Sequence, residues 1–192
     1  MQRQPMTSVF TEEFRPVFHF TPQQNWMNDP NGLLFYKGKY HLFFQHNPSG
    51  ILWGNMSWGH AVSTDLINWQ HLPVAIECTD TAGIFSGSAV VDITNTSGFG
   101  SPENPPMVAI YTVHQNDESN QSQHIAYSLD EGLTWTKYAD NPVLDLGMKD
   151  FRDPKVTWDA DNGRWLMTIA KPKEFKIAFF ASPDLKSWEH LS

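Results

Sequence analysis

A short motif, in which Ser and Asp are separated by one residue and followed closely by Trp, occurs three times along the chain. The copies are STDLINW at 63–69, SLDEGLTW at 128–135 and SPDLKSW at 182–188. Each copy ends a stretch of short runs of β-branched and aromatic residues, broken by Gly, Pro, Asn and Asp. Such a repeat predicts a modular fold in which similar supersecondary units stack on one another.

Counting back from each motif gives four predicted strands per unit. They cover 32–37, 40–46, 58–65 and 69–74, then 86–92, 107–113, 124–130 and 135–139, then 154–159, 164–171, 176–184 and 187–191. Four short antiparallel strands repeated at roughly 50–65 residues are typical of β-propeller blades. The sequence therefore predicts one all-β domain over 1–192, with about three four-stranded blades at about 26–76, 80–144 and 150–192.

The repeated motif itself has a structural interpretation. We expect Asp65, Asp130 and Asp184 to accept hydrogen bonds from turn amides, while the following Trp packs between sheets. These carboxylates are therefore predicted to hold the blades together rather than to catalyse a reaction.

Composition and charge exclude several classes of partner. The net charge of −8 comes without any cluster of Lys or Arg, so neither nucleic acid nor an anionic membrane is an expected partner. Cys78 is the single cysteine, which excludes an internal disulfide. The N-terminal residues lack the apolar core of a signal peptide, which predicts a cytoplasmic protein. Glycosylation patterns at Asn55, Asn95 and Asn120 leave a secreted or vacuolar relative open.

Polar residues precede the first predicted strand of each unit: Asn28-Asp29, Phe85-Ser86 and Arg152-Asp153. Because first strands line the central channel of a propeller, these three pairs should meet at one of its mouths. Two carboxylates at a small neutral cavity favour glycosyl transfer, in which one attacks or stabilises the sugar cation and an acid protonates the leaving oxygen. The structural alternative is that Asp29 shapes a Pro-Asn-Gly turn and Asp153 merely pairs with Arg152.

Three stretches together resemble the motifs of glycoside hydrolase family 32, the family of invertases, inulinases and levanases. They are WMNDPNG at 26–32, FSGS at 85–88 and FRDPK at 151–155. Supporting stretches are YHLFFQHNP at 40–48, WGNMSWGHAVSTDL at 53–66 and NTSGFG at 95–100. The resemblance implies a five-bladed β-propeller, of which this chain is expected to hold about three blades and no C-terminal β-sandwich.

The same resemblance implies a role for each matching residue. Asp29 would be the nucleophile of a retaining mechanism with a fructosyl-enzyme intermediate, and Asp153 would stabilise the oxocarbenium-like transition state. Arg152 would orient the sugar and help to keep the carboxylates ionised. The innermost sugar would be bound by Asn28, Gln45, Trp53 and Ser86, with Trp26 and Phe85 as walls of the pocket. No metal and no cofactor are implied.

The family also needs an acid/base Glu, which lies in a Glu-Cys-Pro motif at the head of the fourth blade. The 192 residues contain no such motif. The segment IEC at 76–78 is rejected as a substitute, because Glu77 follows an outer strand, far from the blade heads, and Thr79 replaces the Pro. We therefore expect little turnover by this chain alone, and an open propeller edge that exposes apolar surface and permits self-association.

The predicted function is release of terminal β-D-fructosyl units from sucrose, inulin or levan. One alternative is a non-catalytic fragment that binds sucrose or fructans. Another is a related five-bladed glycosidase with an inverting mechanism on arabinose polymers, which the WMNDPNG and FSGS pair disfavours.

The histidines, Ser86 and Cys78 are not expected to act as zinc ligands or nucleophiles. His41 and His46 fall on opposite strand faces, so zinc is not expected. Ser86 lacks the Gly-x-Ser-x-Gly context of a nucleophile and is predicted to be a sugar contact. Cys78 is predicted to be an inert core thiol.

Overall fold

The computed structural model describes residues 12–16 and 18–192, and almost all regular structure in them is β-strand. One short 3-10 helix at Pro172–Glu174 is the only helix described there. None of the helices in these ranges is long and apolar enough to cross a bilayer. The stretch 1–11, on which the localisation prediction depends, lies outside the described residues.

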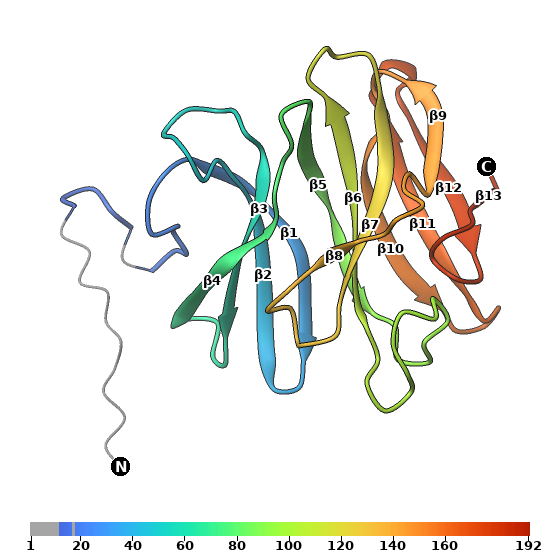
Figure 1. The fold of residues 1–192 in the computed structure, drawn as a ribbon, viewed down its shortest axis with the longest axis horizontal. Helices are drawn as coiled ribbons and strands as arrows, with labels where there is room; N and C mark the ends of the chain where they lie inside the picture. The colour runs from blue at the N-terminus through green and yellow to red at the C-terminus, as the bar shows by residue number, and fades with distance from the viewer. Residues whose placement is uncertain (1–11, 17) are drawn as a thin grey trace.

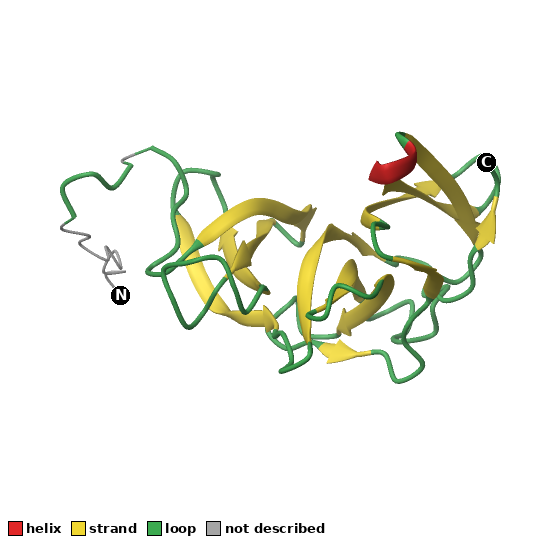
Figure 2. Cartoon of the chain, turned by 90° about the horizontal axis from the view of Figure 1, so that it is seen from above, coloured by secondary structure: helices red, strands yellow, loops and turns green. Residues whose placement is uncertain are grey.

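The strands form three sheets that follow one another from the N-terminal to the C-terminal side (Figures 1 and 2). The first sheet contains β1 (Met27–Tyr36), β2 (Lys39–His46), β3 (Ser57–Ser63) and β4 (Trp69–Ile76). The second contains β5 (Ala82–Val91), β6 (Met107–Gln115), β7 (Gln121–Ser128) and β8 (Thr136–Lys137). The third contains β10 (Arg152–Asp159), β11 (Arg164–Lys171), β12 (Lys176–Ser182) and β13 (Glu189–His190). Neighbouring strands pair antiparallel in chain order, so the all-β prediction with three four-stranded units is confirmed.

One strand was missed by the sequence analysis. β9 (Leu144–Met148) pairs antiparallel with β7 beyond the end of β8. Its sequence LDLGM is short and mostly exposed, and Gly147 has a positive φ of 64°. The segment also holds no β-branched or aromatic residue, so it lacks the composition by which a strand is recognised.

Apolar side chains fill the two spaces between successive sheets. Phe43, Trp58 and Tyr111 are buried in the cluster between the first and second sheets. Ile110 and Phe151 belong to the equivalent cluster between the second and third. Each sheet therefore buries a face against its neighbour, which makes the stacking of sheets the main source of the hydrophobic core.

The Asp of the repeated motif has the structural role that its sequence predicts; Trp135 and Trp188 pack against the clusters between sheets as expected, whereas Trp69 packs against Phe20. In each copy the Asp carboxylate accepts one or two backbone N–H bonds from the turn that follows it, and the Trp indole donates to a carbonyl three residues earlier. The first copy shows the pattern, with Asp65 accepting from the amides of Ile67 and Asn68 at 2.9 and 2.7 Å, and Trp69 donating to Leu66 at 3.2 Å. The equivalent residues are Asp130 with Trp135 and Asp184 with Trp188.

The innermost strand of each sheet carries a β-bulge at the same place. The pairing register slips by one residue between Met27 and Pro30 in β1, between Ile84 and Gly87 in β5, and between Arg152 and Lys155 in β10. Asp29 and its counterparts therefore lie within the first strand of each sheet, and their predicted place before that strand or in a turn was wrong. The Pro and Gly that follow Asp29 favour a turn in an isolated segment, but the same residues within a strand indicate a bulge.

Buried polar side chains join each inner strand to the neighbouring sheet. The Ser88 hydroxyl donates to the Pro154 carbonyl and accepts from the Val156 amide, both at 3.0 Å. The Gln45 amide donates to the Ile84 carbonyl at 3.0 Å, while the Ile84 amide donates to Met56 at 2.7 Å. Neighbouring sheets are thus held at a defined offset as well as pressed together.

Two histidines are buried between the first two sheets. His41 Nδ1 and His60 Nε2 lie 3.1 Å apart, and the His60 ring stacks on Phe43 with centroids 4.0 Å apart. Burial, with a smaller contribution from the neighbouring His41, lowers the pKa of His60 to about 3. Burial also lowers the pKa of His41. Both rings are therefore neutral in the folded protein near pH 7.

Acidification is expected to destabilise the fold through His60. Its folded-state pKa lies below the ordinary value of about 6.5, so unfolding takes up a proton and stability falls as the pH drops below 6.5. At pH 5, about 1.5 pH units lower, His60 costs about 2 kcal/mol of unfolding free energy. Urea denaturation from pH 7.5 to 5 should show a shallower loss of stability for His60→Gln than for the wild type. Burial lowers the pKa of His124 to about 4 as well, so this difference, not the wild-type slope, reports His60.

The exposed His190 provides a control for that experiment. His190→Gln should keep the wild-type pH dependence. Identical pH dependence of His60→Gln and wild type would contradict the assignment.

Ser88→Ala should destabilise the contact between the second and third sheets. The substitution leaves a buried carbonyl and a buried amide without their partner, which costs about 1–3 kcal/mol. Urea denaturation at pH 7.5 measures this loss, and Ser49→Ala in an exposed loop is the matched control, with an expected change below about 0.5 kcal/mol. Equal stability of the two variants would show that the Ser88 bridge is dispensable.

Candidate active site

One cavity of 370 Å³ collects side chains from all three sheets. Its lining residues are Asn28, Asp29, Gln45, Trp53, Phe85, Ser86, Arg152 and Asp153. The bulges of β1, β5 and β10 explain this convergence, because each turns one or two polar side chains away from its ladder toward the same end of the sheets. With Gln45 from β2 and Trp53 from the loop that follows it, eight of the nine predicted site residues are brought together.

Trp26 is the predicted wall residue that does not line this cavity. Its carbonyl instead accepts hydrogen bonds from the Asn47 amide and from His46 Nδ1, both at 3.0 Å. Through these main-chain contacts, Trp26 anchors the chain where β1 begins.

Asp29 is joined directly to the second sheet. The Ser86 hydroxyl donates to Asp29 Oδ2 at 2.8 Å, although the two residues are 57 positions apart in the chain. Asp29 is exposed at the mouth of the cavity, so its other oxygen remains accessible to a ligand.

Asp153 and Arg152 occupy the opposite, third-sheet side of the cavity. Partial withdrawal from water raises the pKa of the Asp153 carboxyl, an effect that Arg152 opposes and the negative charge of Asp29 reinforces. The Arg152 Nε lies 4.0 Å from Asp153 Oδ2. We expected Arg152 to keep this carboxylate ionised. Arg152 acts in that direction, while partial desolvation acts against it.

A buried polar network from the second sheet positions the segment that carries Arg152 and Asp153. Gln123 is fully buried and donates to the Phe151 carbonyl at 2.7 Å. Gln121 Oε1 accepts from the Phe151 amide at 2.9 Å and from Arg152 Nη1 at 3.2 Å. The Asp153 amide, at a positive φ of 64°, donates to the Thr112 hydroxyl at 3.1 Å.

The sequence analysis missed Gln121, Gln123 and Thr112. Each is a polar residue within an otherwise apolar strand, and a buried polar side chain needs a hydrogen-bond partner, which is the pattern that could have identified them.

The FSGS segment is held in the same way by the first sheet. The Trp58 indole donates to the Phe85 carbonyl at 3.0 Å, and Asn31 Oδ1 accepts from the Gly87 amide at 3.3 Å. A Cβ at Gly87 would lie 2.1 Å from the Ile110 carbonyl oxygen, so only Gly fits there.

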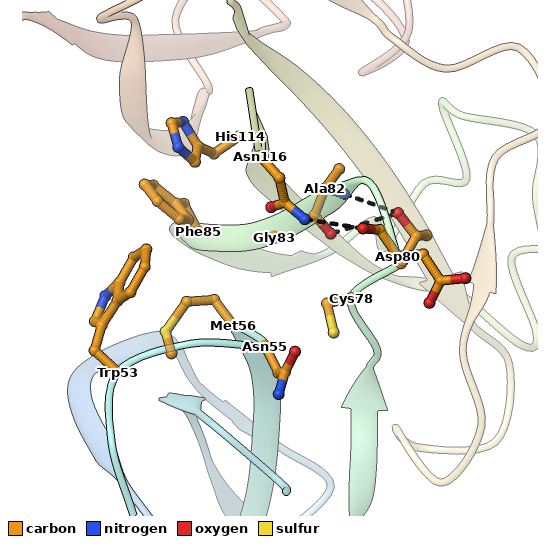
Figure 3. Close-up of a pocket in the computed structure, with 11 residues that line it drawn as sticks. Trp53, Asn55, Met56, Cys78, Asp80, Ala82, Gly83, Phe85, His114 and Asn116 are labelled. Atoms are coloured by element: carbon orange, nitrogen blue, oxygen red, sulfur yellow. Dashed lines mark hydrogen bonds between the residues drawn. The ribbon is translucent and has the colours of Figure 1, made fainter. Parts of the chain in front are cut away.

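A second cavity of 280 Å³ adjoins the first and shares Trp53 and Phe85 with it. Figure 3 shows Trp53, Phe85 and His114 along one side, with Cys78 and Asp80 on the other. Cys78 is half-buried at this wall, so its prediction as a core thiol was wrong.

The segment after β4 also runs closer to the site than expected, since Thr79 and Asp80 line this second cavity. The chain must cross from the outer strand of one sheet to the inner strand of the next, and that path leads past the head of β5. Glu77 itself is exposed and lines neither cavity; its carbonyl accepts from Lys137 at 2.7 Å.

Comparison with known proteins agrees with this architecture. Residues 19–192 match the model of the glycosyl hydrolases family 32 N-terminal domain. The chain is 54% identical over 187 residues to a levanase from Bacillus subtilis, covering 97% of this chain and 27% of that protein. It is 45% identical over 207 residues to an extracellular exo-inulinase from Aspergillus awamori, covering 95% of this chain and 38% of that protein.

Solved structures give the same result for the fold. A β-fructofuranosidase from Schwanniomyces occidentalis, complexed with fructosyl-erythritol, superposes with a TM-score of 0.87 at 49% identity. The alignment covers 93% of this chain and 36% of that one. The prediction of a partial β-propeller is therefore confirmed, and the chain spans between about a quarter and two fifths of these relatives. On the match of its family model, its sequence identity and its fold, the chain belongs to glycoside hydrolase family 32, whose N-terminal domain it represents.

Proposed function

We propose that the first cavity binds the terminal β-D-fructosyl unit of sucrose, inulin or levan for hydrolysis with retention. The observation that carries this proposal is the convergence of eight predicted site residues, from three sheets, on one cavity of 370 Å³. Relatives named levanase and exo-inulinase support the class of substrate.

Asp29 is the proposed nucleophile. Its carboxylate would attack the anomeric carbon, forming a fructosyl-enzyme ester while the bond to the leaving oxygen breaks, and water would then hydrolyse the ester. The Ser86 hydrogen bond supports this role because it orients the carboxylate without supplying a positive charge. Asp153, next to Arg152, would bind fructose hydroxyls and stabilise the oxocarbenium-like transition state.

The leaving oxygen needs a proton from a general acid, which contributes about 10²–10⁴-fold to such reactions. The 192-residue sequence contains no Glu-Cys-Pro motif to supply it. We therefore propose that this chain alone binds substrate with little or no turnover, which leaves a fructan-binding role as the alternative.

We also propose a cytoplasmic location and self-association for this chain. The proposed location differs from that of the similar exo-inulinase from Aspergillus awamori, which is named extracellular. On the third sheet, Ile177 and Phe179 are 56% and 42% exposed, which supports self-association through this open face.

The binding proposal predicts that Trp53 contributes to affinity for a fructan trisaccharide. Trp53 is 62% exposed and its ring meets Phe85 edge-on at 6.3 Å, an arrangement suited to a sugar face. Trp53→Ala should weaken binding about tenfold in isothermal titration calorimetry, whereas Trp158→Ala, an exposed Trp outside both cavities, should not. Equal affinities of the two variants would contradict the proposed site.

The catalytic proposal predicts almost no fructose release by the purified chain from sucrose or inulin. Quantification of released fructose, with Asp29→Asn as the blank, measures it. Release well above that blank would show that the chain supplies its own acid.

The second cavity predicts a dependence on ligand length. A ligand longer than one ring would extend past Trp53 and Phe85 toward Asp80. Asp80→Ala should weaken trisaccharide binding about threefold to tenfold, the effect of one hydrogen bond, and leave fructose binding unchanged. Calorimetry with both ligands tests this: unchanged trisaccharide affinity would place its outer rings elsewhere, and an equal loss for both ligands would show that Asp80 acts on the innermost sugar instead.

A further inference from the structure

His114 lines the second cavity and contacts both Phe85, a wall of the first, and Gln121, which holds Arg152. Its ring stacks on Phe85 with centroids 4.5 Å apart and an interplanar angle of 23°. Its Nδ1 lies 3.2 Å from Gln121 Nε2, and the two residues are directly paired across β6 and β7. The mechanism proposed above assigns no role to His114.

The orientation of the Gln121 amide follows from its other neighbours. The atom facing the Phe151 amide and Arg152 Nη1 must be the carbonyl oxygen, because both of those groups can only donate. The amide nitrogen therefore faces His114, and it too can only donate. It follows that His114 Nδ1 must carry no proton, which selects the neutral imidazole with its proton on Nε2.

Protonation of His114 would break this arrangement. A proton on Nδ1 would face the Gln121 N–H group, and the amide would relieve the conflict by rotating its oxygen toward the imidazolium. The rotated amide would then present its nitrogen to the Phe151 amide and to Arg152. Arg152 would retain only the Asp150 carboxylate, at 2.8 Å, as its strong partner.

We propose that His114 is a positioning residue for fructoside binding, which acts through Gln121 on Arg152 and through ring stacking on Phe85. The inference rests on the proposed function of the cavity, since Arg152 and Phe85 are its proposed sugar-binding residues. It predicts that sugar affinity depends on the protonation state of His114.

The surroundings of His114 set the direction of this dependence. Burial lowers the pKa of His114; Arg152 and Lys149 lower it further, while Glu118 and Asp150 oppose them. The transition should therefore occur below the ordinary histidine pKa of about 6.5, so binding weakens as the pH falls through the acidic range. The pKa of the Asp153 carboxyl is raised, toward the pH range of this experiment, so variants must separate the two groups.

Two substitutions of His114 test its hydrogen bond with Gln121 and its stacking on Phe85 separately. His114→Asn keeps an acceptor oxygen close to the position of Nδ1 but removes the ring that stacks on Phe85. His114→Phe keeps the ring but offers no acceptor to Gln121. Neither variant titrates in this range, whereas the Asp153 contribution is common to all three proteins.

The experiment measures binding of a fructan trisaccharide by calorimetry from pH 7.5 to 5, with near-UV circular dichroism to verify folding at each pH. We expect His114→Phe to bind about tenfold more weakly than wild type at pH 7.5. His114→Asn should retain more affinity than His114→Phe, and it should lose less of it on acidification than wild type does. Wild-type affinity for His114→Phe, or the same pH dependence in wild type and His114→Asn, would overturn the proposal.

A spectroscopic readout tests the inference without any ligand. Long-range ¹H–¹⁵N correlation spectra of the histidine rings at pH 7.5 should show His114 with its proton on Nε2, and a proton on Nδ1 would overturn the inference. Failure of wild type to bind the trisaccharide, together with the expected tautomer, would refute the function proposed for the cavity and leave the Gln121 contact in place.

Discussion

Polar side chains that cross between sheets determine the geometry of this molecule. Apolar clusters press the sheets together, but apolar contact alone would allow them to slide. The buried contacts of Gln45 with Ile84, Ser88 with Pro154, and Gln123 with Phe151 remove that freedom, since a displaced sheet would leave buried groups unpaired. Each contact also lies within a few residues of a bulge, so the offset between sheets and the shape of the cavity depend on the same bonds.

The bulges convert an ordinary sheet into a binding surface. A regular inner strand would alternate its side chains between two buried faces and leave no place for a carboxylate. One extra residue at the same point of β1, β5 and β10 turns Asp29, Ser86 and Asp153 out of their ladders. The 2.8 Å bond between Ser86 and Asp29 then ties two of these bulges together across a sheet boundary.

Sequence patterns predicted most of the strands because the residue pattern that favours a strand is local. Alternating and apolar runs, bounded by turns, are visible in any window of a few residues. The same windows misplaced Asp29 in a turn, because Pro and Gly fit a turn and a bulge equally well. They also gave no sign of β9, whose five residues pair with β7 but include no β-branched or aromatic residue.

The sequence by itself determined the all-β class, the three repeated units, the family and the residues most worth examining, since each depends on residue types at fixed spacings. Only the tertiary structure decided that eight of these residues share a cavity while Trp26 anchors β1, and that Cys78 and Asp80 line a second cavity beside it. It alone revealed Gln121, Gln123 and His114 behind the site. The reason is physical: a buried hydrogen bond between sheets joins residues far apart in the chain, and its partner cannot be read from either residue's neighbours.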